Sequence, residues 1–445
     1  MNRTGTFTVA GAGLGGSLLA GLLGKNGRRL DVYEMRPDPR QSGGGAGRSI
    51  NLAISTRGMH ALGRVGLAER VRKMAVPMRG RMIHSPRGRL SFQRYGTRER
   101  QVLNSVSRSE LNAALLEKAE SFPGVRFHFG KKCVGVDLGT GDLSLQDTGT
   151  GETISVPTDG LVGADGAFSA IRKQMLRTDH FAFQESYLSH GYKELTIPPG
   201  PGGGHAMETN ALHIWPRGGY MMIALPNRDG SFTCTLFWPL EKPGSFAGLG
   251  TEAEVRSLYR RSFPDAVPLL PDLVGDFFGN PTGSLVTIRC KPWHLGGRAA
   301  LLGDACHAVV PFYGQGANAA FEDGVVLEDC LEKHGPDREA AFAEYQLLRR
   351  QNTDVLADLS LANFREMRAR TASAAFRWKK TAGRGLHRLF PAWFIPLYTL
   401  VTFTRVPYAE AVRRSRRQNL AVGILVSILS LIAGALIWRS VFFNS

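Results

Sequence analysis

The sequence predicts an α/β protein in which a Rossmann-like domain is interrupted by a mainly antiparallel β-sheet domain. C-terminal helices and one transmembrane helix are expected to follow. Three observations predict this architecture. A glycine-rich turn follows a short apolar strand near the N-terminus, the middle of the chain changes to β-rich sequence, and a long uncharged apolar segment lies near the C-terminus.

The N-terminal turn has the spacing GxGxxG, with Gly11, Gly13 and Gly16 in the three glycine places. In a dinucleotide-binding fold the first glycine permits the tight turn and the second lets a pyrophosphate approach the backbone. The third lets helix and strand pack closely. The N-terminus of the following helix then faces the phosphates. The alternative is an ordinary glycine turn without a ligand.

A second predicted strand, at residues 30–34, ends in the carboxylate of Glu34. Glu34 lies about 20 residues beyond the glycines, where this fold binds a ribose hydroxyl. The β-like run at residues 48–55 suits a segment that wraps a bound cofactor. The glycine-rich loop at residues 42–47 leads into it and is equally well explained as a surface loop.

Two later buried strands end in acidic turns, the first at Asp165-Gly166 and the second at Gly303-Asp304. The turn at residues 311–318 opens a further helix, whose free N–H groups are expected to face an anion or a carbonyl group. Residues 317–380 are helical by pattern. We expect these separated pieces to meet in one fold.

The changes in texture along the chain predict a discontinuous first domain. The predicted divisions are residues 1–75, 101–178 and 291–335 for the Rossmann-like domain, residues 76–100 and 179–290 for the sheet domain that binds the substrate, residues 336–412 for a C-terminal helical region, and residues 420–438 for a membrane anchor.

The composition excludes several classes of protein. Charged residues make up 21% and hydrophobic residues 43% of the 445 residues, which is typical of a globular chain rather than a disordered one. The net charge of +17 suits anionic ligands or an acidic membrane surface, and no nucleic-acid module signature accompanies it. The five cysteines are odd in number and show no CxxC spacing, which disfavours a disulfide framework or a zinc site.

Residues 420–438 contain no charged side chain and have about the length that a spanning helix needs. Four arginines precede the segment and one follows it, and the positive-inside rule then places the body of the protein on the cytosolic side. This expectation fits a mitochondrial outer membrane or a bacterial inner membrane. A buried core helix is the alternative. The arginines are Arg413, Arg414, Arg416, Arg417 and Arg439.

A second apolar segment, at residues 389–403, is broken by Pro391 and Pro396. It is too short to span a bilayer. We expect it to form either a packed helix or an interfacial segment.

With these pieces in place, the sequence resembles the FAD-dependent aromatic hydroxylases, and in particular those that hydroxylate L-kynurenine. The similarity extends from about residue 7 to the C-terminal apolar segment. The runs that carry it are residues 31–34, 48–53, 77–85, 213–217, 232–237, 397–399 and 401–403.

The resemblance implies that the bound cofactor is FAD. It assigns the adenine to the backbone at Cys133, the path to the flavin to Ala53 and Arg108, and a ribityl or pyrophosphate contact to Asp304. The alternative for Cys133 is a small buried apolar side chain. The FAD-binding residues implied are Gly11, Gly13, Leu14, Gly15, Gly16, Tyr33, Glu34, Met35, Arg36, Ala53, Arg108, Cys133, Asp304, Ala317 and Asn318.

The resemblance also implies a substrate pocket formed by Arg81, Tyr95, Asn363 and Tyr398. Arginine can grip the α-carboxylate of kynurenine bidentately, and the other three side chains can donate neutral hydrogen bonds. Gln315 and Phe312 fall near the substrate ring in this family, whereas the family has different residue types at the position of Tyr313.

The implied reaction uses NADPH and O2 and yields 3-hydroxykynurenine, a step of tryptophan catabolism towards NAD. NADPH reduces FAD, and a flavin hydroperoxide transfers oxygen to the ring carbon beside the amino group. Because the arylamine activates its own ring, no catalytic side chain is expected. There is no second GxGxxG in the sequence, so NADPH is expected to bind transiently on the flavin domain.

Two other functions remain open at this stage. A membrane flavoprotein that acts on a lipid would also explain the apolar C-terminal segments. A catalytically silent flavin sensor or membrane scaffold would keep the same FAD-binding pieces. Arg81 and Tyr95 favour an amino acid as the substrate.

Overall fold

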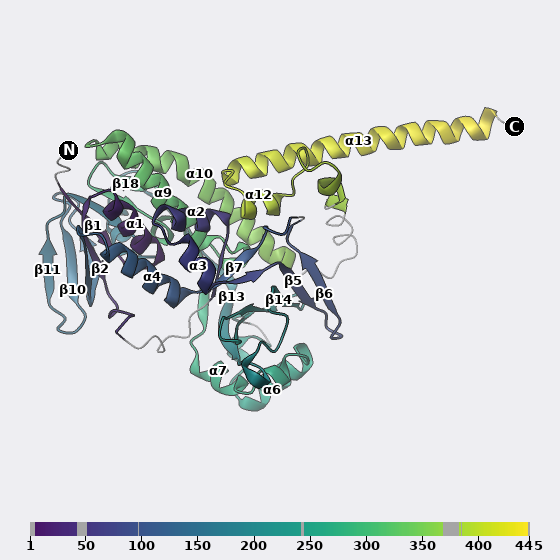
Figure 1. The fold of residues 1–445 in the computed structure, drawn as a ribbon, viewed down its shortest axis with the longest axis horizontal. Coiled ribbons are helices and arrows are strands. Elements are labelled where there is room, and N and C mark those ends of the chain that lie inside the picture. Colours follow the sequence, from purple (N-terminus) through teal and green to yellow (C-terminus); the bar gives the residue numbers. More distant parts are fainter. Residues whose placement is uncertain are drawn as a thin grey trace.

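The computed structural model describes residues 5–41, 51–96, 98–241, 244–367, 382–383 and 385–443. Two large sheets meet beside a group of long helices, and one C-terminal helix projects away from the body (Figure 1). The first sheet organises the glycine turn, and the second carries Arg81.

The first sheet has six strands in the order β18-β19-β12-β1-β2-β8. Its strands pair in parallel, except that β18 is antiparallel to β19. Short runs of fully buried residues such as Val9 and Val162 form these strands, as expected for a parallel sheet covered on both faces. The strands are β1 (Thr6–Ala10), β2 (Arg29–Glu34), β8 (Val125–Phe129), β12 (Gly160–Gly163), β18 (His294–Leu295) and β19 (Ala299–Leu301).

Helices and a small sheet cover the first sheet. Figure 1 shows the three-stranded sheet β11-β10-β9 at the left of the strands and helices α1 and α4 to their right. Apolar side chains from both coverings join one core with the central strands. The covering elements are α1 (Leu14–Lys25), α4 (Arg108–Glu120), α5 (Ala170–Met175), β9 (Lys131–Val136), β10 (Leu143–Asp147) and β11 (Thr153–Val156).

A small antiparallel sheet, β3-β7-β4, lies between the two large sheets in the chain path. It carries Ala53 on β3 and leads directly into α4 through β7. Its elements and the helices beside them are β3 (Asn51–Ile54), α2 (Thr56–Arg64), α3 (Ala68–Met74), β4 (Val76–Met78) and β7 (Leu103–Ser107).

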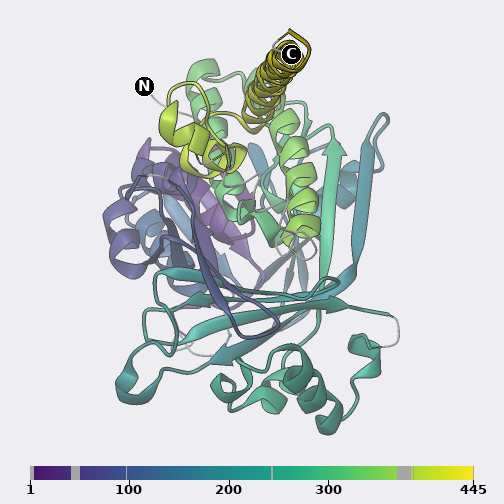
Figure 2. The same ribbon diagram turned by 90° about the vertical axis from the view of Figure 1, so that its right-hand side faces the viewer.

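The second large sheet has seven strands in the order β17-β13-β16-β15-β14-β5-β6. Every pair is antiparallel except β14 with β5, so the expectation of a mainly antiparallel sheet is met. In Figure 2, helices α6 and α7 lie below this sheet and α10 above it. The elements are β5 (Gly80–His84), β6 (Leu90–Arg94), β13 (Ala182–Ile197), η1 (Pro201–Gly203), β14 (Ala211–Pro216), β15 (Met221–Pro226), β16 (Phe232–Pro239), η2 (Phe246–Gly248), α6 (Glu252–Ser262), η3 (Val267–Leu269), α7 (Leu273–Gly279) and β17 (Gly283–Lys291).

The helical pattern after residue 316 divides into two helices. The break falls at Gly335, where φ is +60°, and at Pro336, which cannot continue the hydrogen-bond ladder. Residues 368–380 of the expected helical stretch lie outside the described residues. The elements of this part are α8 (Asp304–His307), η4 (Pro311–Tyr313), α9 (Gly316–His334) and α10 (Arg338–Arg365).

The segment at residues 389–403 is divided into two parts in the structure. Helix α12 (Leu397–Phe403) begins after Pro396 and buries Leu400 and Val401, whereas the residues before it are largely exposed. Thus only the second half of the segment is a packed helix.

Helix α13 runs without a break from Tyr408 to Phe443, so it includes the arginine cluster that the sequence placed before an apolar helix. Over Tyr408–Ala435 it is long and apolar enough to cross a membrane, and only 6% of its apolar window is buried in the protein. The alternative of a buried core helix therefore does not hold. Figure 1 shows α13 leaving the body with most of its length free of other elements.

Candidate active site

The turn between β1 and α1 uses its three glycines for different purposes. Gly11 has a φ of +101°, and a Cβ there would lie 2.5 Å from the carbonyl oxygen of Ala164. A Cβ on Gly16 would lie 2.0 Å from the carbonyl oxygen of Gly11. In contrast, a Cβ on Gly13 would meet no atom within 4 Å. Gly11 and Gly16 thus allow the backbone to pack, while Gly13 leaves space in front of the N-terminus of α1.

Glu34 closes the turn from the end of β2. Its carboxylate accepts the backbone N–H of Ala12 at 2.9 Å and both the backbone N–H and the Nε–H of Arg36, at 3.1 and 2.8 Å. Burial alone would raise the pKa of Glu34, but the hydrogen bonds and charge of Arg36 lower it. The carboxylate is therefore ionised and can accept a hydroxyl. Met35 and Arg36 have largely exposed side chains.

Tyr33 and Cys133 are the next two residues that the resemblance assigns to the cofactor. The Tyr33 ring stacks on His128, with ring centroids 4.7 Å apart. Cys133 lies on β9, which starts just after Gly130, and the Gly130 N–H donates to the carbonyl of Arg36 at 3.2 Å. Burial raises the pKa of Cys133 to about 12, so its thiol is neutral.

Asp304 lies on the other side of the glycine turn, at the N-terminus of α8. It is exposed to solvent, although the surrounding protein raises the pKa of its carboxyl group by desolvation, against the opposing charges of His307 and Arg108. A side chain that is accessible and yet enclosed by protein is one that faces a cleft. Arg108, the exposed first residue of α4, lies near enough for its charge to act on this carboxyl group.

Glycine packing brings the end of β19 against the turn. A Cβ on Gly15 would lie 3.0 Å from a methyl group of Leu302, and one on Gly303 would lie 3.0 Å from the side chain of Ala320 in α9. The structure therefore brings together the glycine turn, the Gly-Asp strand end and α9, as the sequence predicted.

The start of α9 is joined to the β3–α2 connection through one amide. Asn318 accepts the backbone N–H of Ser55 at 2.9 Å and donates to the carbonyls of Ala53 and Gly314, at 2.9 and 2.8 Å. The side chain of Asn318 is thus occupied by protein. The backbone N–H groups at the start of the helix, including that of Ala317, have no partner within the helix and remain the groups that can face a ligand.

Arg81, Tyr95 and Tyr398 form one cluster, although they come from β5, the segment after β6, and α12. The Arg81 guanidinium lies 4.8 Å from the centre of the Tyr398 ring and 5.7 Å from that of Tyr95. The two tyrosine rings stack at 5.5 Å, and Phe403 packs against both. The cluster is an aromatic box that holds a buried cation.

Two polar atoms in this box are buried without a hydrogen-bond partner, namely Arg81 Nε and the hydroxyl of Tyr95. Within the described ranges, no carboxylate forms an ion pair with Arg81. Burial raises the pKa of Tyr95 above its usual value, so its hydroxyl is a neutral donor. Burying a polar group without a hydrogen-bond partner costs free energy, so a ligand is expected to supply the missing partner. The box is therefore a candidate site for an anion.

Asn363 lies on the neighbouring wall. Its amide nitrogen donates to the carbonyl of Phe312 at 2.5 Å, and the Phe312 ring stacks on Phe364 at 4.3 Å. Tyr313 links this wall to the box, because its ring lies 5.6 Å from that of Tyr398. The wall beside the cation is therefore aromatic.

The strand that carries Arg81 is fixed from its other face. His84 contacts Asp265 at 2.7 Å and His213 at 2.8 Å, while Trp215 donates its indole N–H to the same carboxylate at 2.8 Å. These bonds tie β5 to β14 and to the segment that follows α6. His213 and Trp215 belong to a run that supported the family resemblance, and their observed contacts hold β5 in place.

A buried ionic network, which the sequence analysis did not find, joins α2, α9 and α10. Arg349 pairs with Asp323 at 2.6 Å and with Glu322 at 2.5 Å, His307 contacts Asp323 at 2.5 Å, and Arg57 pairs with Glu322 at 2.6 Å. Burial alone would raise the pKa of Asp323, but the charges of His307 and Arg349 lower it.

The same network extends to the N-terminal end of α13. Arg57 donates to the carbonyls of Val401 and Val406, and its guanidinium lies 4.1 Å from the centre of the Tyr408 ring. The Tyr408 hydroxyl donates to the side-chain oxygen of Gln315 at 3.2 Å. The C-terminal segment is thus bound to the loop that begins α9. No local sequence signal links these positions.

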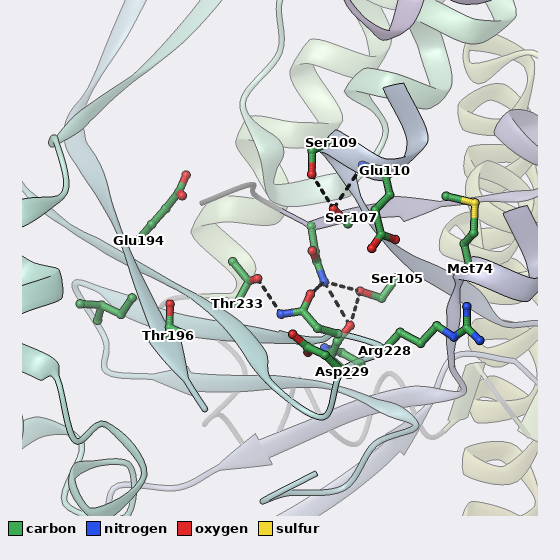
Figure 3. Close-up of a pocket in the computed structure, with 14 residues that line it drawn as sticks. Met74, Ser105, Ser107, Ser109, Glu110, Glu194, Thr196, Arg228, Asp229 and Thr233 are labelled. Atoms are coloured by element: carbon green, nitrogen blue, oxygen red, sulfur yellow. Dashed lines mark hydrogen bonds between the residues drawn. The ribbon is translucent and has the colours of Figure 1, made fainter. Parts of the chain in front are cut away.

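A polar cavity of about 260 Å³ lies between the seven-stranded sheet and the small sheet β3-β7-β4 with the start of α4, and the sequence analysis did not predict it. Figure 3 shows Ser107, Ser109 and Glu110 at the start of α4 on one side of it and Glu194 on the other. Burial raises the pKa of Glu194, and the charge of Arg108 opposes this shift. The charge of Arg108 also opposes the raised pKa of Asp304.

The residues present fit FAD. The open space at Gly13, the ionised Glu34 and the cleft-facing Asp304 with Arg108 match a pyrophosphate, a ribose and a ribityl chain in turn. Across the described stretches of the chain, no group of three or more His, Cys, Asp or Glu side chains could hold a metal ion.

The comparisons with known proteins agree with this geometry. Residues 4–350 match the family model described as FAD binding domain. A kynurenine 3-monooxygenase of Myxococcus xanthus is 49% identical over 409 residues, which is 92% of this chain and 88% of the relative. One of Salinispora arenicola is 48% identical and covers 97% of this chain and 98% of its own.

Among solved structures, a tetrameric 2-methyl-3-hydroxypyridine-5-carboxylic acid oxygenase superposes with a TM-score of 0.68 at 24% identity. The match covers 84% of this chain and 95% of that one, and at this identity it supports the fold alone. Together with the sequence relatives, which span nearly the whole length, these findings lead to one conclusion. The chain belongs to the kynurenine 3-monooxygenase family of FAD-dependent hydroxylases.

Proposed function

We propose that this chain hydroxylates L-kynurenine to 3-hydroxykynurenine with NADPH and O2. The observation that carries the proposal is the buried cation of Arg81, whose Nε lacks a protein partner inside a box of aromatic side chains. A kynurenine molecule has the matching parts, since its α-carboxylate pairs with a guanidinium and its ring suits an aromatic wall.

The proposed FAD site is the cleft between the glycine turn and the Gly-Asp strand end. Gly13 and the N-terminus of α1 meet the pyrophosphate, Glu34 the adenosine ribose, and Asp304 with Arg108 the chain that leads to the flavin. The backbone at Ala317 meets the flavin. When bound, FAD supplies hydride acceptance from NADPH and the activation of O2 for transfer to the substrate ring.

The residues of this chain bind, orient and exclude water. Arg81 holds the carboxylate of the substrate, with the hydroxyls of Tyr95 and Tyr398 beside it. The rings of Tyr313 and Phe312 form walls that keep water from the reacting ring. Because the arylamine of kynurenine donates electrons into its own ring, none of these side chains has to act as a strong base.

The domain division proposed from the sequence suits this function. The six-stranded sheet gathers strands from residues 1–75, 101–178 and 291–335. The seven-stranded sheet gathers strands from residues 76–100 and 179–290, and its strand β17 continues one residue further, to Lys291. The region at residues 336–412 then supplies Asn363 and Tyr398 to the substrate pocket.

We further propose that α13 anchors the protein in a membrane with the catalytic body in the cytosol. The support is its apolar, largely exposed length and the arginines on the body side, which the positive-inside rule places in the cytosol. A bacterial inner membrane and a mitochondrial outer membrane both meet this condition.

Product analysis with the purified full-length protein tests the proposal. With FAD, NADPH, ¹⁸O2 and L-kynurenine, mass spectrometry is expected to show 3-hydroxykynurenine with one labelled oxygen atom. L-phenylalanine, which lacks the arylamine, serves as the control and is expected to remain unchanged. NADPH consumption that depends on an isoprenoid lipid, with no hydroxykynurenine formed, would favour the lipid-acting alternative and contradict the proposal.

A further inference from the structure

A short turn beside α13 exposes large apolar side chains. The aromatic turn, as we call residues 389–393, leaves 73% of Leu389, 55% of Phe390 and 48% of Trp393 exposed. The next residue, Phe394, is buried. The turn is internally ordered, since the backbone N–H of Trp393 and that of Phe394 both donate to the carbonyl of Phe390. Its apolar side chains therefore point outward from a fixed backbone.

Hydrogen bonds fix the aromatic turn at one level along α13. Gln418 donates its side-chain N–H to the carbonyl of Trp393 at 2.7 Å, and Arg414 donates to the carbonyl of Ala392 at 3.4 Å. The apolar run of α13 begins at Leu420, two residues after Gln418. Trp393 thus lies at the boundary between the charged and the apolar part of the helix. This is the depth at which tryptophan gathers in membrane proteins.

Exposed arginines lie near the boundary between the charged and the apolar part of α13. Arg416 and Arg417 are exposed on α13, and Arg388 is exposed next to the aromatic turn. None of the three forms an ion pair with the residues that the structure describes, whereas the nearby Arg413 pairs with Glu410. Exposed arginines beside an aromatic surface match the headgroups and the upper acyl region of an acidic bilayer.

We propose that the aromatic turn inserts into the membrane interface beside α13 and, with Arg388, Arg416 and Arg417, forms a second contact with acidic lipids. This inference rests on the proposed membrane attachment through α13. The lipid surface is favoured over a protein partner because the turn lies at the level where the apolar helix begins. The contact also bears on the substrate pocket, since the chain passes from Trp393 through Pro396 into α12, which carries Tyr398.

Quenching by brominated lipids tests the proposal on the full-length protein. We compare the wild type with Trp393→Phe and Trp438→Phe in vesicles of phosphatidylcholine and phosphatidylglycerol, brominated near the top of the acyl chains. The Trp393→Phe variant is expected to lose a component that shallow bromines quench strongly. The Trp438→Phe variant is expected to lose a different component, which reports the apolar end of α13.

The two components separate the two proposals. Quenching of Trp438 without quenching of Trp393 would overturn the interfacial contact and leave the anchor intact, whereas absence of both would overturn the anchor as well. In the Arg388→Gln, Arg416→Gln and Arg417→Gln triple variant, the Trp393 component is expected to fall in phosphatidylglycerol vesicles and to stay the same in pure phosphatidylcholine. A wild type that is dimeric in detergent, with a monomeric Trp393→Ser variant, would assign the aromatic turn to a second copy of the chain instead.

Discussion

The glycine turn at the start of α1 and the Arg81 box meet their ligands in different ways. The turn offers backbone groups and empty space, and its glycines are within six residues of one another. The box offers side chains from segments that are far apart in the chain, among them Arg81 and Tyr398, and it leaves polar atoms without partners. A change at the turn therefore acts first on cofactor binding, and a change in the box on substrate binding.

The buried network between the two regions is expected to give the largest effect. Asp323→Asn leaves the Arg349 guanidinium with one carboxylate fewer in a buried position, which costs about 3–5 kcal/mol of folding free energy. Because Glu322 and Arg57 connect the network to the loops of both regions, FAD retention and the KM for kynurenine are both expected to worsen. Urea unfolding and the absorbance ratio of flavin to protein measure this. The control is Arg350→Gln, which removes a partly exposed cation next to Arg349 on α10. A variant as stable as the wild type would show that the two regions are held together by something else.

Arg81→Ala is expected to give the next largest effect and to act on one region only. A charge-assisted hydrogen bond contributes about 1.5–3 kcal/mol, so the KM for kynurenine should rise roughly 10- to 150-fold. FAD should stay bound, because Arg81 lies outside the glycine turn. Steady-state kinetics and flavin absorbance measure the two effects in one preparation. Arg79→Ala removes the same side chain from an exposed position two residues away and should leave the KM unchanged.

A pair of glycine variants separates packing from ligand binding at the turn. Gly16→Ala would bring a Cβ within 2.0 Å of a backbone oxygen, so the strand and helix must move apart. Overpacking of this kind costs about 1–3 kcal/mol, and both stability and FAD should be lost. Gly13→Ala meets no protein atom, and it should weaken FAD binding while the FAD-free protein melts near the wild-type temperature. Equal melting losses in the two FAD-free variants would contradict the roles assigned here.

The smallest expected effect is a pH dependence that only the cofactor region has. Arg36 lowers the pKa of Glu34 in the folded protein, although burial opposes it. A lowered carboxyl pKa adds stability that is present above the unfolded pKa and is lost as the pH falls through the folded pKa. Glu34→Gln should therefore reduce the acid-induced loss of stability and of FAD below about pH 4.5. Arg81 does not titrate in this range, so kynurenine binding by FAD-loaded protein should not share this limb. An unchanged acid limb in Glu34→Gln would show that another carboxyl group controls it.

The difference between the two regions also explains what could be predicted from the sequence. Gly11, Gly13, Gly16 and Glu34 follow a short pattern in which each position has its own physical reason, and the structure has them together. The break at Gly335 could equally have been placed from local signals. By contrast, Arg57 and Glu322 are 265 residues apart along the chain and no pattern of spacing pairs them.

The substrate residues depended on a resemblance to known proteins and not on any local rule. A single arginine on a predicted strand, such as Arg81, does not by itself indicate a functional role. The role is indicated by the burial of its guanidinium against Tyr95 and Tyr398. The length of α13 was underestimated for a physical reason, because exposed arginines continue a helix as readily as apolar residues do. The first three residues of the run at residues 48–55, which was expected to wrap the cofactor, lie outside the described residues, as does the glycine-rich loop at residues 42–47.

Titration of kynurenine into FAD-loaded protein, followed by the change in the flavin absorbance spectrum, tests the division of labour most directly. The wild type and Arg81→Ala are expected to carry the same amount of FAD. The variant should need a roughly 10- to 150-fold higher concentration of kynurenine to reach half of the spectral change. Equal kynurenine affinity in the two proteins, or loss of FAD from the variant, would contradict the account.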